Sequence, residues 1–311
     1  MCEMRVGHSN ITMQQQGLCA TRHPVNMAPP MSSPTASDTV MIPVKLCSLP
    51  PFHPVAAKLM TLSLDGGADL KQLVSIVSAD PALAAEILFL ANSSLFGFPA
   101  RIESLRHAVA VLGMDCIRQI AVTLAMRALA RGTGPFVHDC WRHSIACAVI
   151  GEKLSAVFGC STDQAYSAGL LHDAGRLGFL RTYPSEIGVV LDRDYADAEA
   201  VMDAERLVMN SAHTEAGAWL MEYWVLPAVF GETCAHHHDE LAESDSPLLR
   251  CIKTACRLAS SMGYTPVRYR SVGTCDEVLE AAVPSRMWAS LPKAIDILEA
   301  VEGRLRVFDR R

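Results

Sequence analysis

Histidines with polar or acidic neighbours gather in the second half of the chain, in the segments WRHS, LLHDAGRL, SAHTEAG and HHHDE. Imidazole and carboxylate are ligands of catalytic transition metals, which several helices must hold together so that one position stays open for water. The pattern therefore predicts a metal site. Its candidate ligands are His143, His172, Asp173, His213, His237 and His238.

The expected helical positions of these residues limit how they could meet. His172 and Asp173 are adjacent, so on one helix they project about 100° apart and share a metal only over the helix edge. His213 lies on the face of Gly217 and Leu220 and is expected to point inward. A single histidine is more often a core or surface residue than a ligand, but the ordered set within a helical bundle favours a shared site.

Composition limits the classes of function. The 311 residues carry a net charge of -6 and a pI near 6.0, and 50% of them are hydrophobic, so generic electrostatic binding of nucleic acid is disfavoured. No apolar run reaches the roughly 18 residues of a membrane span. Eleven scattered cysteines without a C-x-x-C pair, and no signal peptide, indicate reduced thiols and a cytoplasmic location.

The elements that would position the histidines are helices almost throughout. Asp80-Pro81 and Ser104 are helix-start signals, Asp115 is expected to cap a third helix, and Gly132 to Pro135 break the pattern. Further helices are predicted at about 138–158, 162–173, 199–209, 211–223, 227–238, 246–261 and 292–307. No alternating run predicts a strand. The fold class is all-α, in two packed helical bundles.

Four segments are predicted along the chain. Residues 1–44 hold five of the 17 prolines and are expected to form a disordered tail, unless the start is mis-assigned. The first bundle is placed at 45–135, the second at 136–265, and a C-terminal linker and helix at 266–311.

The stretch from Leu49 to Met262 resembles the HDOD domain, the HD-related output domain of bacterial signalling proteins. VSADPALAAEILFLANSSLFGFPARIESLRHAVAVLGMDCIRQIAV resembles the first half of that family, and the histidine segments follow in the order of the HD and HD-GYP phosphohydrolases. The resemblance implies an HD-like second bundle.

Three departures separate the chain from the catalytic relatives. Cys256 in IKTACRLAS stands where the resemblance implies the last aspartate ligand, and the D-G-x-G-Y-P extension is absent after HHHDE. Arg176 replaces the expected lysine and is a candidate phosphate contact. A thiol is compatible with zinc but disfavours an oxygen-rich iron or manganese centre.

Two hypotheses follow from the resemblance and its departures. The favoured one is a non-catalytic output or adaptor module in motility, biofilm or cyclic-di-GMP-linked control. It would act on other signalling proteins, with any cyclic nucleotide system acting in trans and no cofactor beyond a vestigial divalent metal. The alternative is a metal-dependent HD-type phosphohydrolase acting on a phosphodiester or nucleotide, in which metal-bound water supplies hydroxide.

Overall fold

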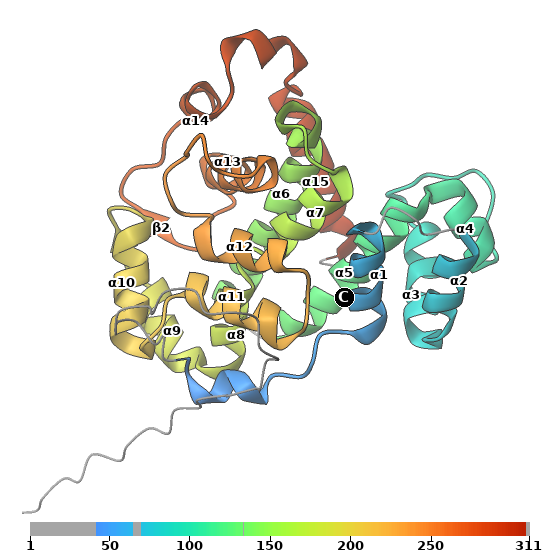
Figure 1. Cartoon of the computed structure of the whole chain (residues 1–311), viewed down its shortest axis with the longest axis horizontal. Coiled ribbons are helices and arrows are strands. Elements are labelled where there is room, and N and C mark those ends of the chain that lie inside the picture. Colours follow the sequence, from blue (N-terminus) through green and yellow to red (C-terminus); the bar gives the residue numbers. More distant parts are fainter. Residues whose placement is uncertain (1–41, 65–69, 133, 309–311) are drawn as a thin grey trace, which may run out of the picture.

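The structure is a computed structural model that describes residues 42–64, 70–132 and 134–308. Within these ranges the chain forms fifteen α-helices, two short 3-10 helices and one pair of two-residue parallel strands. The predicted all-α class with two packed bundles is confirmed (Figure 1). Among the described residues no single helix is long and apolar enough to span a membrane, and two bent helix pairs meet that criterion by length and composition only.

The first bundle consists of α1 (Pro54–Leu64), α2 (Leu70–Ser78), α3 (Pro81–Ala91), α4 (Leu105–Leu112) and α5 (Met114–Leu129). Asp80 and Ser104 cap α3 and α4 as predicted, each accepting a backbone N–H three residues later. Asp115 is not a cap. Gly113, at φ 84°, both ends α4 and begins α5, a backbone conformation that favours glycine.

The second bundle is built around one long helix. It consists of α6 (Pro135–Phe158), α7 (Thr162–Leu171), α8 (Ala174–Thr182), α9 (Pro184–Leu191), α10 (Ala198–Met209), α11 (His213–Tyr223), α12 (Ala228–His236) and α13 (Pro247–Ser261). Helix α6 packs against α7 and α13, while α11 packs against α8 and α12. This arrangement brings the ends of α7 and α12, the start of α11 and the middle of α6 and α13 toward one another.

Helices α8 and α9 were not predicted. Gly175 indicates a helix break in the sequence, but it lies inside α8, where a Cβ would collide with the backbone carbonyl of His213. The glycine therefore permits close approach of α8 and α11 rather than ending a helix. Gly159 does end α6, in the left-handed conformation at φ 72°.

The C-terminal segment has more structure than a linker. Strand β2 (Arg268–Tyr269) pairs with β1 (Asp194–Tyr195), and α14 (Cys275–Ala282) and the 3-10 helix η2 (Ser285–Ser290) follow. The predicted last helix is α15 (Ala294–Phe308), which packs along α6. The strand pair is too short to produce a readable alternation in the sequence.

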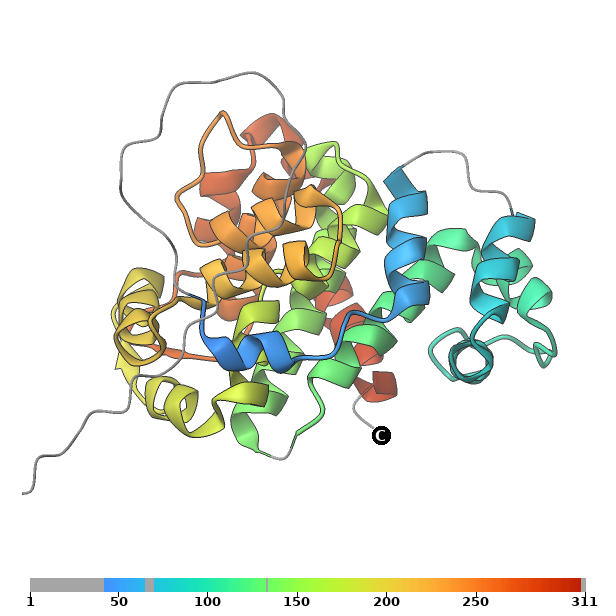
Figure 2. The same ribbon diagram turned by 60° about the horizontal axis from the view of Figure 1, so that its bottom comes forward.

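The described chain begins against the second bundle, not the first. The 3-10 helix η1 (Val44–Ser48) contacts α8 (Figure 2). The backbone N–H of Lys45 donates to the Tyr183 hydroxyl. Residues 1–41 of the predicted disordered tail lie outside the described residues. At its last positions the structure departs from that prediction, because Ile42 and Pro43 are buried.

One hydrophobic core runs through both bundles, from Ile42 to Phe308. Helix α5 contacts α3 and α4 on one side and α7 and α8 on the other, so it belongs to both packing units. At the join, the Arg181 guanidinium donates to the carbonyl of Arg131 at 2.6 Å. The second bundle is thereby held in a continuous apolar framework around its polar centre.

Candidate metal centre

Helix α6 presents two donors on one face. His143 and Cys147 are four residues apart, so both point toward α7 and α13, and both are buried. The His143 Nδ1 lies 2.6 Å from the carbonyl oxygen of Tyr264. A backbone carbonyl only accepts, so Nδ1–H is the donor and the Nε2 lone pair faces the centre of the bundle.

His172 and Asp173 lie at the corner between α7 and α8 rather than within one helix. Helix α7 ends at Leu171, His172 is its C-cap, and Asp173 precedes the first residue of α8. The change of direction at this corner lets both adjacent side chains face the same interior, whereas on the predicted helix 162–173 they could share a metal only over the helix edge. His172 Nδ1–H donates to the Gly169 carbonyl at 2.6 Å, which again leaves Nε2 available.

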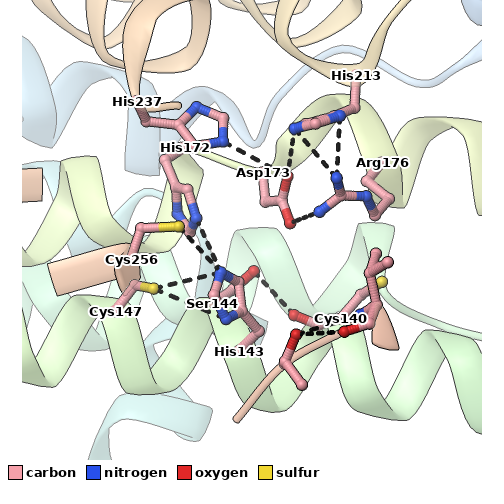
Figure 3. A network of polar contacts seen from close by, with 12 residues as sticks. Cys140, His143, Ser144, Cys147, His172, Asp173, Arg176, His213, His237 and Cys256 are labelled. Atoms are coloured by element: carbon pink, nitrogen blue, oxygen red, sulfur yellow. Dashed lines mark hydrogen bonds and ion pairs between the residues drawn. The ribbon is translucent and has the colours of Figure 1, made fainter. Parts of the chain in front are cut away.

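A buried charge network holds the other side of Asp173. Arg176 donates to Asp173, and His213 lies beside both residues (Figure 3). Arg176 Nε also donates to Glu205 of α10 at 3.3 Å, and His213 contacts Glu205 as well. Burial alone would raise the pKa of Asp173 and of Glu205. The charges of Arg176 and His213 hold both pKa values below their usual range.

Arg176, predicted as a candidate phosphate contact, is surrounded by protein groups in the structure. Its side chain is 2% exposed and is fully engaged by Asp173, Glu205 and His213. The second carboxylate that holds Arg176 belongs to Glu205, which the sequence analysis did not single out. It shares the inward face of α10 with Val201 and Met209, four residues away on each side, and a carboxylate on such a face was the only signal.

The histidine pair after α12 divides between two environments. His237 is buried, and its Nδ1–H donates to the Cys234 carbonyl at 2.9 Å, whereas His238 is half-buried. Burial lowers the pKa of His237 to about 3, so the imidazole is neutral near pH 7. The Nε2 atoms of both rings are buried without a hydrogen-bond partner among the described residues, as is Oδ1 of Asp173.

Two thiols complete the centre. Cys256 of α13 faces the histidines, at 3.6 Å between its Sγ and His143 Nε2, and Cys147 Sγ lies 3.5 Å from the same nitrogen. A hydrogen bond from Cys147 lowers the pKa of Cys256 against the effect of burial, and burial raises the pKa of Cys147. Cys147 was not predicted, although its spacing of four residues from His143 was a readable signal.

The donors form three overlapping groups, in each of which the ligand atoms lie within 4.8 Å of one another. The groups are His143, Cys147, His172 and Cys256; His172, Asp173 and His237; and His213, His237 and His238. All seven residues that the sequence analysis placed near a metal therefore lie in one cluster. The buried nitrogen and oxygen atoms that lack a hydrogen-bond partner are suitable ligands for a cation. The two thiols favour zinc over a pair of iron or manganese ions, which prefer oxygen ligands.

Comparison with known proteins decides the family. The model of the HDOD domain matches residues 49–240. The chain belongs to the HDOD family. An uncharacterized protein of Treponema pallidum (strain Nichols) is 26% identical over 194 residues, which are 60% of this chain and 37% of that protein. The chain thus spans little more than a third of the length of this curated relative.

Solved structures share the HDOD fold. An HDOD domain protein of Geobacter sulfurreducens aligns with a TM-score of 0.66 at 22% identity, over 84% of this chain and 91% of that one. A Marinobacter aquaeolei VT8 protein provisionally named for signal transduction aligns with a TM-score of 0.67 at 22% identity, over 85% of this chain and 60% of that one. A Shewanella amazonensis SB2B protein provisionally named a metal-dependent phosphohydrolase aligns with a TM-score of 0.57 at 21% identity, over 85% of this chain and 95% of that one. At such identities the likeness shows the fold alone.

Proposed function

We propose that the chain is a non-catalytic signalling output module that changes the activity of other proteins by direct contact. The observation that carries the proposal is the closure of the polar centre. His172 and Asp173 are completely buried, and His237 is 1% exposed. A hydrolytic metal needs a position open to water and substrate, and these donors are instead enclosed by α6, α8, α11, α12 and α13.

The chemistry of the centre supports the same proposal. Phosphodiester hydrolysis relies on a metal held by hard oxygen donors and on a cation that reaches the phosphate. Here Cys256 supplies a thiol in place of the last carboxylate, and Arg176 is neutralised by Asp173 and Glu205. The polar groups thus stabilise the second bundle instead of facing a substrate.

A groove outside the centre offers a contact surface. It has a volume of about 910 Å³ and lies between the end of α3 and the last helix α15, with Phe89 and Leu95 on one wall and Ala300 and Val307 on the other. Phe89 is 54% exposed. A groove that combines apolar walls with charged side chains at Asp296, Glu299 and Arg306 would suit contact with another protein, which we place in a motility, biofilm or cyclic-di-GMP pathway in the cytoplasm.

The test for catalysis uses the full chain loaded in turn with zinc, manganese and iron. Each form is incubated with cyclic dinucleotides, nucleoside polyphosphates and a chromogenic phosphodiester, beside the matched variants Asp173→Asn and His237→Ala. We expect product release no faster than that of either variant. Turnover by the wild type that is lost in His237→Ala, with unchanged circular dichroism, overturns the proposal.

The contact surface has its own test in a bacterial strain that lacks the native gene. Phe89→Glu should abolish complementation of the output, whether swimming or biofilm mass, because it places a charge on the apolar wall of the groove. Leu207→Glu is the control, since Leu207 is 85% exposed on α10 and away from the groove. Equal complementation by both variants would argue against the groove.

A metal-dependent phosphohydrolase is the second candidate. One observation favours it: His172, Asp173 and His237 bring their ligand atoms within 4.8 Å of one another, and among the described residues neither Asp173 Oδ1 nor His237 Nε2 has a hydrogen-bond partner. The substrate panel described above distinguishes the two functions.

A further inference from the structure

The four donors His143, Cys147, His172 and Cys256 have the spacing of a tetrahedral zinc site. Zinc bonds of about 2.0–2.1 Å to nitrogen and about 2.3 Å to sulfur place two tetrahedral nitrogens about 3.3–3.4 Å apart and a nitrogen and a sulfur about 3.5–3.6 Å apart. The His143 and His172 Nε2 atoms are 3.2 Å apart, and the two sulfurs lie 3.5 and 3.6 Å from His143 Nε2.

The hydrogen bonds of the two histidines turn their Nε2 atoms toward each other, an arrangement that suits a cation between them. Both Nδ1–H groups are used, one by the Tyr264 carbonyl and the other by the Gly169 carbonyl. Neutral rings held in this way bring two Nε2 lone pairs face to face at 3.2 Å, which is repulsive. A metal ion between the two nitrogens turns this repulsion into coordination, and the carbonyls then act as the second-shell partners that orient metal-bound histidines.

Charge and burial also fit zinc. Two thiolates neutralise a divalent ion, and all four residues are buried in the described structure. The ligands come from α6, from the corner after α7 and from α13, the same helices that pack most closely in the second bundle. Two histidines and two cysteines with no open position are the donor set of a structural site.

We propose that His143, Cys147, His172 and Cys256 bind one structural zinc ion that fastens α6, the α7–α8 corner and α13 together. The site shares His172 and the position of Cys256 with an HD-type hydrolytic centre, but it differs from that centre because Cys147 supplies a fourth donor and neither Asp173 nor His237 takes part. The proposal does not rest on the absence of catalysis, because its tests measure metal, not turnover.

The first experiment measures bound metal in the purified, dialysed full chain by mass spectrometry. We expect one zinc per wild-type chain, and loss of zinc in Cys147→Ser and in Cys256→Ser. Cys140→Ser is the matched control, because Cys140 is a buried cysteine of the same helix α6 that lies outside the cluster. Zinc-free wild type after growth and purification with zinc, or full zinc in both serine variants, overturns the proposal.

The second experiment replaces zinc with cobalt(II) and records the absorption spectrum. Two thiolates in a tetrahedral site should produce a strong sulfur-to-cobalt charge-transfer band together with intense d–d bands. Cys256→Asp keeps a ligand at that position, so it remains informative if a serine variant fails to fold. The charge-transfer band of this variant should weaken, and its metal-binding preference should shift from zinc toward manganese. A spectrum without a sulfur band, or one unchanged in Cys256→Asp, would contradict the assignment.

The two proposals fail in different ways. Zinc without turnover supports both, whereas zinc with turnover overturns only the adaptor function. A wild type that binds no zinc and turns over no substrate overturns only the zinc site.

Discussion

Arg176, which the sequence analysis named as a candidate phosphate contact, forms buried ion pairs within the second bundle. Its guanidinium is enclosed by Asp173, Glu205 and His213, and every one of these side chains is at most 2% exposed. Burial of such charges is costly unless all partners are present, because each is removed from water. The network therefore makes the second bundle dependent on each member.

The first prediction concerns this network. Arg176→Met should lower the free energy of unfolding by about 3–5 kcal/mol, because two buried carboxylates lose their cation. Urea denaturation measures the change. Arg206→Met is the control: Arg206 pairs with Glu215 and Asp203 at the surface, so its loss should cost less than about 1 kcal/mol. Equal losses would mean that burial is unimportant at Arg176.

The second prediction belongs to the zinc ligands as individual residues. Treating the wild type with a strong zinc chelator should lower its melting temperature, because metal binding stabilises only the folded state. Cys147→Ser should melt at the same temperature with and without chelator, whereas Cys140→Ser should respond as the wild type does. Differential scanning calorimetry measures both. A chelator effect that persists in Cys147→Ser would place the metal elsewhere.

At the scale of elements, the corner between α7 and α8 decides the geometry of the centre. The helix break lets His172 face Cys256 while Asp173 faces Arg176. The corner is held in place by glycines, since a Cβ at Gly169 would overlap the backbone of α6, and one at Gly175 would overlap the backbone of α11. Small residues at these two positions are thus what allows three helices to approach one point.

The third prediction tests the close approach of α8 and α11. Gly175→Ala should destabilise the protein by about 1–3 kcal/mol or more, because the added Cβ meets backbone that cannot move aside easily. Gly188→Ala in α9 is the matched control, since its Cβ would meet only Phe136 at 3.9 Å. That variant should be neutral or more stable by up to about 1 kcal/mol. Chemical denaturation of both variants gives the comparison, and no loss in Gly175→Ala would refute the packing argument.

At the scale of the whole molecule, the first described residues join the two bundles. Leu46 and Leu49 pack onto α8 at Gly178, and the Trp224 indole donates to the Pro50 carbonyl at 3.1 Å before the chain enters α1. The segment 42–53 thus crosses the second bundle on its way to the first. The continuous core described above implies that the bundles unfold together.

The fourth prediction compares two truncated chains. A chain that starts at Pro51 loses the burial of Leu46 and Leu49, about 1.5–3 kcal/mol for each, so its melting temperature should fall by roughly 10 °C. A chain that starts at Ile42 retains these contacts and should melt close to the full chain. Thermal unfolding followed by circular dichroism measures all three. Equal melting of the two truncated chains would show that the segment contributes nothing.

The fifth prediction concerns the join between the bundles. Proteolytic cleavage at residues 131–135 should leave the two pieces associated on size-exclusion chromatography, because α5 packs on α7 and α8 and the core is shared. The nicked protein should also unfold in one transition. Separate elution, or two transitions, would mean that the bundles are independent.

Local signals were sufficient for most helices. Asp80 and Ser104 cap helices where predicted because capping depends on neighbours within one turn. Helix α8 was missed because Gly175 reads locally as a break, and there packing against α11 outweighed the local preference. Helix α14 was missed although the capping box of Thr274 and Glu277 is a local signal for its start.

The sequence by itself determined the family and the fold class, because apolar periodicity and motif order are properties of consecutive residues. It also named the histidines, Asp173 and Cys256 as one group. Only the tertiary structure decided what they do there. It closed the centre, paired Arg176 with Glu205, and brought Cys147 to Cys256 across more than 100 residues of chain. The physical reason is that ligand geometry and desolvation depend on how helices pack, and residues distant in the sequence decide that packing.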